Sequence, residues 1–138
     1  MKRPAEVTIS GLLVLIFTSL NAIRTWTSLA WTKVLTEFSV SLPPSTSALI
    51  GAVWALIGMT LFFAILLKTK WAGTMLRWAF VLYTAWYWGE RFFIEATPRP
   101  NVLFGVIVNL TLFVIIFFAS RSLTREAYER DNKNSAIE

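Results

Sequence analysis

Two ionisable residues lie beside long apolar stretches, where an unpaired charge would be costly. Arg24 follows the charge-free segment 7–23, and Glu90 follows the aromatic segment 78–89. Inside a bilayer a lone charged side chain costs about 2.5–3.5 kcal/mol, so such residues are usually paired or functional. The two residues therefore predict an ion pair between two helices, formed directly or through one water.

Uncharged polar residues accompany this pair at similar expected depths. Helix geometry places Asn21 and Asn109 about 12 Å below the same face of a ~30 Å hydrocarbon core. Tyr83, Tyr87 and Glu90 share one helical face, because they are separated by four and three residues. We expect these side chains to form one polar layer that satisfies the remaining donors and acceptors of the ion pair. The predicted cluster is Asn21, Arg24, Tyr83, Tyr87, Glu90 and Asn109.

Two alternative pairings remain open at this level. Glu90 could pair with Arg91 or Arg99 near the surface, and Arg24 could meet an acidic residue of a partner protein. Adjacent residues on a helix point about 100° apart, so Arg91 is a poorer partner than a residue on a facing helix.

The composition excludes several kinds of chemistry. The chain has no cysteine and no histidine. It therefore has no disulfide, no thiolate nucleophile, no metal site of the Cys or His type and no histidine-ligated haem. No serine stands beside a candidate base. We expect a protein that is not an enzyme and needs no metal or cofactor, although its Trp and Tyr faces could touch lipid, quinone or pigment.

The composition also predicts where the chain folds. Of its 138 residues, 56% are hydrophobic and 15% charged, whereas soluble domains contain about 25% charged residues. We expect one all-α integral membrane domain of four antiparallel transmembrane helices, followed by a short polar tail. The predicted spans are about 8–35, 45–67, 71–94 and 101–120, and the tail is 121–138.

Local signals set the boundaries between these spans. The loop at 33–47 contains two prolines that block a helix, and one of the three hydroxyl residues after them is expected to cap the second span. The link at 68–70 is so short that the second and third spans must be antiparallel neighbours. Segment 122–130 can continue as a helix, whereas 131–138 has the composition of a disordered end.

The second span carries small residues along one side. Gly51, Ala55 and Gly58 lie on one helical face, together with other alanines. Small residues let helix backbones approach closely in lipid, where packing must replace the hydrophobic driving force. We therefore expect this face to pack against another helix.

The basic residues predict the orientation. An even number of spans leaves both termini on one side, with nine of the thirteen Lys and Arg residues. Because basic residues concentrate on the cytoplasmic side, both termini are expected there. The nine are Lys2, Arg3, Lys68, Lys70, Arg77, Arg121, Arg125, Arg130 and Lys133; the other four are Arg24, Lys33, Arg91 and Arg99.

Several motifs resemble a family of small uncharacterised bacterial four-span membrane proteins. They are RPAEVTISGLLVLIFTSLNAIR, SALIGAVWALIGMTLFFAILLK and YTAWYWGERFF, followed by a last apolar span. The specific elements are Asn-x-x-Arg at 21–24, GxVWAxxG at 51–58 and Tyr-Trp-x-x-Arg at 87–91. The resemblance covers Arg3 to about Phe118. It implies this fold in the bacterial inner membrane and implies no activity.

Two functions fit these features. The first is a small accessory or structural subunit at the edge of a larger respiratory, photosynthetic or transport complex. The alternative is an oligomeric transporter or channel component that uses the outer polar layer, although four spans are few and no inverted repeat is visible. The expected partners are the lipid bilayer and other membrane subunits. Nucleic acid is not expected, because the basic residues flank apolar runs.

Overall fold

The computed structural model describes residues 4–38, 41–95 and 100–136, and in these ranges it contains helices and no strand. Three of its helices are long and apolar enough to cross a membrane, and they make the chain compatible with a membrane-embedded protein. The elements in order are α1 (Ala5–Ala30), α2 (Thr32–Glu37), α3 (Pro44–Leu66), α4 (Ala72–Gly89), the π-helix η1 (Glu90–Ile94) and α5 (Val102–Ser135). The three apolar helices are α1, α3 and α5.

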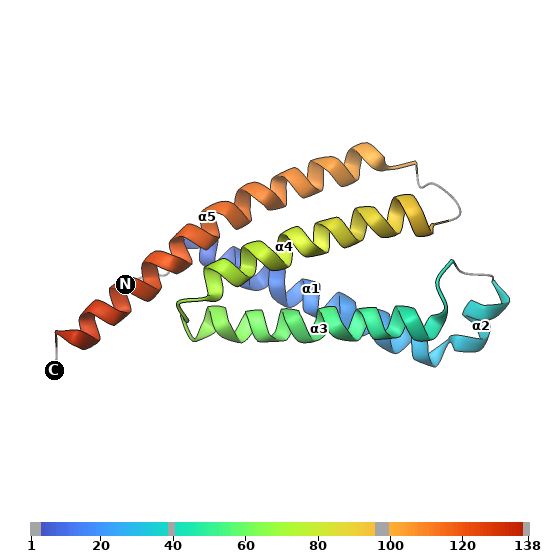
Figure 1. Cartoon of the computed structure of the whole chain (residues 1–138), viewed down its shortest axis with the longest axis horizontal. Coiled ribbons are helices and arrows are strands. Elements are labelled where there is room, and N and C mark those ends of the chain that lie inside the picture. Colours follow the sequence, from blue (N-terminus) through green and yellow to red (C-terminus); the bar gives the residue numbers. More distant parts are fainter. Residues whose placement is uncertain (1–3, 39–40, 96–99, 137–138) are drawn as a thin grey trace.

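The long helices form two pairs that run antiparallel in sequence order (Figure 1). Helix α3 packs along α1, α4 packs along α5, and α1 also touches α5. Both termini and the tight α3–α4 turn lie at one end of the molecule (Figure 1). We call this the terminal end. The opposite end, which holds α2, η1 and the start of α5, is called the loop end.

Small residues join α1 to α3, as the sequence predicts. Gly51 and Gly58 are buried, and Ala55 is half-buried. A Cβ added at Gly51 would lie 2.6 Å from the Thr25 hydroxyl oxygen, and one at Gly58 would collide with the hydroxyl of Thr18. Only glycine permits this approach, so the expected packing face is confirmed and its partner is α1.

A second close approach joins α4 to α5 at the terminal end. A Cβ added at Gly73 would lie 2.6 Å from the backbone oxygen of Ser120. One turn further along α4, Arg77 Nε donates to Ser120 Oγ at 2.9 Å. The arginine side chain is thus satisfied by the neighbouring helix.

The hydrophobic core lies mainly at this terminal end. Its largest buried side chains include Val7, Leu61, Ile65, Leu76 and Leu123. The last of these belongs to the segment that the sequence assigns to a separate polar tail. The backbone of α5 shows no break near residue 120, so the start of this segment is part of the packed structure.

The first span ends earlier than predicted. Helix α1 stops at Ala30, and the backbone of Trp31 (φ −111°, ψ 26°) separates it from the short helix α2. The expected loop at 33–47 therefore begins with a helix of six residues. The helix that could form the first span therefore ends at Ala30, and not at about residue 35 as predicted.

The start of the second span differs in mechanism from the prediction. Helix α3 begins at Pro44, and no side chain caps it. Pro43 is extended (φ −54°, ψ 139°), and a proline fits the first helical position because its missing N–H has no partner there anyway. The expected hydroxyl cap is therefore absent, and the Ser47 hydroxyl instead accepts a hydrogen bond from Arg24.

The helix expected as the third span, α4, changes its hydrogen-bonding pattern at Glu90. The backbone N–H of Glu95 donates to the Glu90 oxygen at 3.0 Å, a bond five residues apart. The predicted continuous α-helix over 71–94 is therefore a helix that ends in one π-helical turn. Such turns are rare and occur often at functional sites.

The end of α5 is more ordered than the sequence predicts. Helix continues to Ser135, so the expected disorder from residue 131 is wrong over 131–135; residues 137–138 lie outside the described part. Two contacts attach it to the α3–α4 turn. Arg130 Nη1 donates to the Leu67 oxygen at 2.7 Å, and Lys70 Nζ lies 2.7 Å from Asp131 Oδ2.

Candidate functional site

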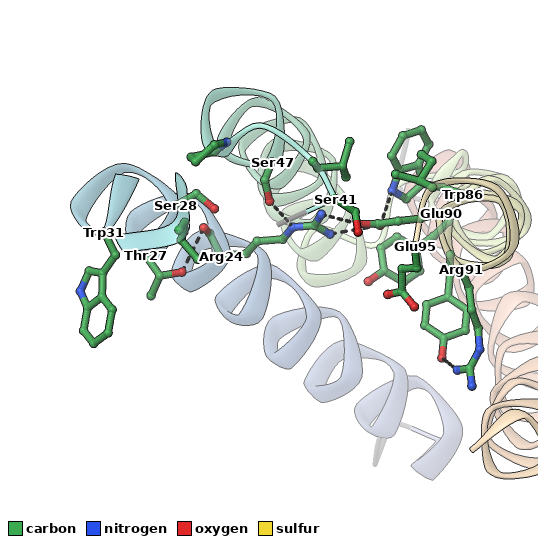
Figure 2. A pocket seen from close by; sticks show the side chains of 16 residues that line it. Arg24, Thr27, Ser28, Trp31, Ser41, Ser47, Trp86, Glu90, Arg91 and Glu95 are labelled. Atoms are coloured by element: carbon green, nitrogen blue, oxygen red, sulfur yellow. Dashed lines mark hydrogen bonds and ion pairs between the residues drawn. The ribbon is translucent and has the colours of Figure 1, made fainter. Parts of the chain in front are cut away.

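An ion pair between Arg24 and Glu90 lies at the loop end of the bundle (Figure 2). Arg24 Nη2 donates to Glu90 Oε1 at 2.7 Å, and Nη1 reaches Oε2 at 3.4 Å. Two nitrogens thus face two oxygens, the arrangement that makes arginine–carboxylate pairs strong and specific in direction. This is the pair that the sequence predicts, formed directly.

Two further side chains complete the ion pair. Arg24 Nε donates to Ser47 Oγ at 3.0 Å, and Trp86 Nε1 donates to Glu90 Oε2 at 3.1 Å. Residues from α1, α3, α4 and η1 therefore meet at one point. The side chains of Arg24 and Glu90 are 30% and 20% exposed, so the pair is half-buried and still reached from outside.

Helical spacing explains why these residues meet. On α1 the buried polar residues Thr18, Asn21 and Ser28 form one stripe, and Arg24 lies at its edge, where a long side chain can extend past α3. On the other side, Trp86 lies four residues before Glu90, so its indole N–H lies above the carboxylate. The π-helical turn starts at Glu90 itself.

Arg91 forms a second polar centre that points away from the first. Its side chain is buried, with Nη1 donating to the Tyr87 hydroxyl at 2.9 Å and the guanidinium 5.7 Å from the Trp88 ring. A Cβ added at Gly105 would lie 3.7 Å from Arg91 Nη1, so this arginine faces α5. The sequence analysis missed Arg91 as a buried group. The spacing of Tyr87 and Arg91, four residues apart, is the signal that indicates it.

The predicted polar layer forms only in part: the side chains of Asn21 and Tyr83 interact, but neither asparagine bonds to the ion pair. Asn21 Nδ2 donates to the Phe17 oxygen within its own helix at 2.9 Å. Asn109 Nδ2 donates to the Gly105 oxygen at 2.8 Å. Each asparagine thus donates to the backbone of the preceding turn, a common solution for short polar side chains in helices, and Asn109 Oδ1 also accepts from the Thr84 hydroxyl of α4 at 3.4 Å.

The remaining members of the predicted cluster also have other partners. Tyr87 accepts from Arg91 rather than serving Glu90. The ring of Tyr83 packs edge-on against Phe17 (4.5 Å between centroids) and Trp54 (5.0 Å). Because these rings come from α1, α3 and α4, they hold the three helices together directly below the ion pair. The alternative partner Arg99 lies outside the described residues.

A polar pocket of about 660 Å³ opens beside the ion pair. Its wall contains two cations and two anions, together with indole rings and hydroxyl groups (Figure 2). The charged residues are Arg24, Glu90, Arg91 and Glu95. Described residues of α1, α2, α3, α4 and η1 all contribute to its lining.

An apolar groove of about 390 Å³ lies next to this pocket, between the two helix pairs. All four long helices line it, mostly with aliphatic and aromatic side chains. Tyr83 and Tyr87 line both the polar pocket and the apolar groove, so the two spaces are neighbours. Both volumes lie in the range of ordinary small-molecule sites.

The site offers binding groups rather than an obvious reaction centre. The carboxylate of Glu90 accepts three hydrogen bonds from side chains of this chain, so its oxygens are largely satisfied within the fold. Among the described residues no group of three or more acidic side chains could hold a metal ion. What the arrangement can do is present balanced charges above an apolar groove.

No protein-family model, curated protein or solved structure matches this chain. The comparisons therefore identify no family. The resemblance of its motifs to small bacterial four-span proteins stays a prediction.

Proposed function

We propose that this chain is an integral membrane protein with four spans, and that it is a non-catalytic accessory subunit of a larger membrane assembly. The observation that carries the proposal is the exposure of its most apolar helix. Only 11% of the most apolar part of α5 is buried within the chain, compared with 28% in α1 and 33% in α3. Apolar surface left in water costs about 25 cal/mol per Å², so a face of this kind needs lipid or a protein partner.

The path of the chain supports α4 as the fourth span. Helix α3 ends at the terminal end and α5 begins at the loop end, so α4 and η1 must run the full length between them (Figure 1). Helix α4 contains Arg77 and five Trp or Tyr residues, which lower its hydropathy. Its arginine is bonded to Ser120 and the following Glu90 to Arg24, which reduces the cost of a membrane position.

The orientation follows from the same path. The side that holds the α3–α4 turn and both termini carries nine of the thirteen Lys and Arg residues, and we propose that it faces the cytoplasm of a bacterial cell. The test uses single cysteines in a chain that has none. In intact cells, Thr36→Cys in α2 should react with a membrane-impermeant thiol reagent, and Thr69→Cys in the turn should react only after lysis. Labelling of the turn from outside would contradict the topology.

The accessory role is tested by a matched pair of outward positions. Leu110 on α5 is 61% exposed, and Leu56 on α3 is 69% exposed. If α5 is the face that meets a partner, Leu110→Trp should remove a heteromeric band from blue-native gels of mild-detergent extracts. Leu56→Trp should leave that band unchanged. Equal migration of both variants with the wild-type chain would argue against a partner at α5.

A transporter or channel component remains the second candidate, and the polar pocket is the observation that favours it. Four spans enclose little space, so a transport path would need several copies of the chain. A stable homo-oligomer on the same gels, in place of a heteromeric band, would support this alternative.

A further inference from the structure

The polar pocket and the apolar groove together have the shape of a site for a molecule with a charged head and an apolar tail. We propose that they bind a membrane phospholipid with a zwitterionic head group, with its head in the polar pocket and one acyl chain in the groove. The inference rests on the proposed membrane embedding of the chain and is independent of the accessory role.

The first support is that the two spaces adjoin. Tyr83 and Tyr87 line both, so a molecule that fills both would pass along these two side chains. Each tyrosine has an apolar ring and a polar hydroxyl, the combination that suits the boundary between a head group and hydrocarbon. On the polar side, Trp31 and Trp86 line the pocket, as expected of indole at a membrane interface.

The second support is the length of the groove. On α1 it extends from Leu20 to Ser10, and on α4 from Tyr87 to Leu76. At about 1.5 Å per residue these stretches are about 15 Å long. That is half of a ~30 Å hydrocarbon core, the depth that one acyl chain occupies in one leaflet.

The third support is the charge of the polar pocket. Arg24, Glu90 and Glu95 stand on its wall, and Arg91 also lines it although its guanidinium faces α5. A purely anionic head would lie against the carboxylates, and an uncharged head such as a quinone ring would desolvate the Arg24–Glu90 pair without replacing its water. A head with a phosphate and an ammonium group offers both signs. Arg24 has five N–H donors, of which three make the hydrogen bonds described above, so donors remain for a phosphate.

The chain offers a matched pair of substitutions to test the groove. Val108 and Val106 are both on α5 and both 37% exposed, but only Val108 lines the groove. Val108→Trp should fill the groove, whereas Val106→Trp places the same bulk outside it. Both positions are accessible enough that neither substitution disturbs the buried core.

The experiment uses the full chain in vesicles of phosphatidylglycerol that contain a minor fraction of phosphatidylethanolamine with a photoreactive acyl chain. After irradiation, adducts are mapped by peptide mass spectrometry. We expect adducts concentrated on the groove faces of α1 and α4, reduced several-fold by Val108→Trp and unchanged by Val106→Trp. Photoreactive phosphatidylglycerol should label these faces several-fold less.

The possible failures are distinguishable. Adducts spread evenly over all outward faces, or equal labelling in the two variants, would overturn the lipid site alone. Equal labelling by both lipids would refute the preference for a zwitterionic head, and loss of labelling on addition of a long-chain quinone would assign the site to that class instead. A chain without adducts on any helix would contradict the membrane embedding on which the proposed function depends.

Discussion

The terminal and loop ends of this molecule differ in what fills the space between the helices. At the terminal end, α4 touches α5 so closely that Gly73 has no room for a Cβ, and buried aliphatic side chains occupy the rest. At the loop end, the helix pairs are joined by an ion pair and three aromatic rings, with a pocket and a groove beside them. The α4–α5 seam is closed by backbone contact at the terminal end, whereas long side chains bridge the two helix pairs at the loop end.

This difference indicates how the chain can be stable and still offer a site. Close packing tolerates little change in volume, because protein interiors have few voids. Long polar side chains instead fix a distance between helices while leaving space next to them. Because the terminal end supplies most of the core, the loop end can contain open space between its helices without a large loss of buried apolar surface.

The largest expected effect comes from breaking the ion pair at the loop end. Arg24→Leu or Glu90→Leu leaves one half-buried charge without its partner, and in the proposed membrane position such a charge costs up to about 2.5–3.5 kcal/mol. The double variant Arg24→Leu/Glu90→Leu should cost less than the sum of the two, because it removes both charges. Thermal or denaturant unfolding in detergent measures all three. Strict additivity would show that the two side chains do not stabilise the fold as a pair.

The terminal end contains a matched control for this experiment. Arg125 and Glu129 form another Arg–Glu pair with an N–O distance of 2.9 Å, but their side chains are 83% and 48% exposed. Exposed pairs four residues apart on a helix contribute about 0.3–0.5 kcal/mol. Arg125→Leu should therefore change stability far less than Arg24→Leu. A similar loss from both would mean that the position of the ion pair between helices has no special importance.

A second, smaller effect compares the two ends of the α4–α5 seam. Gly73→Ala places a methyl group 2.6 Å from a backbone oxygen, so the helices must separate, at a cost of about 1–3 kcal/mol. At the loop end, a Cβ at Gly105 meets nothing closer than the Tyr87 hydroxyl at 3.4 Å, so Gly105→Ala should not destabilise, because alanine is preferred over glycine in a helix interior by about 0.8–1.0 kcal/mol. Unfolding midpoints of the two variants decide this. Equal destabilisation would contradict the contrast between a closed and an open end.

The ion pair could be predicted from the sequence because membrane depth limits the choices. Arg24 and Glu90 are charges of opposite sign at similar expected depths on different helices, and an unpaired charge there is costly. The packing face of Gly51 and Gly58 could be predicted for a similar reason, since small residues at helical spacing have few other uses in a span. In both cases one strong physical constraint, the cost of an unpaired charge or the need for close helix packing, limits which neighbours the residues can have.

Other features depend on contacts between segments that are far apart in the sequence. The π-helical turn at Glu90 has no local signal in the sequence. A residue's helix propensity is the same whether its N–H bonds to the oxygen four or five residues before it. Asn21 and Asn109 each donate to their own helix and also interact with a polar side chain of α4, Tyr83 and Thr84 respectively, and these second contacts depend on how distant segments pack. The packed start of the tail did have a signal that was missed: Ala119, Leu123 and Ala127 recur every four residues and are all buried.

The smallest expected effect concerns the attachment of the α5 end by Lys70 and Asp131. Both side chains are more than half exposed, at 61% and 53%, so salt should weaken the pair. The hydrogen bond to Asp131 and its negative charge raise the pKa of Lys70 above its usual 10.5. A raised pKa means that the stabilisation is complete below pH 10.5 and is lost as the pH rises through the higher value of the folded chain.

Lys70→Met should therefore loosen only the last turns of α5, because Arg130 still donates to the Leu67 oxygen and Leu123 remains in the core. Amide hydrogen exchange should become faster over residues 128–135 and stay unchanged in α1 and α3. Raising the pH above the pKa of Lys70 should loosen the same turns in the wild-type chain, with no additional effect in Lys70→Met once intrinsic exchange rates are accounted for. Faster exchange throughout α5 at neutral pH would instead show that this exposed pair stabilises the whole terminal end, and that its closure depends on more than backbone contact.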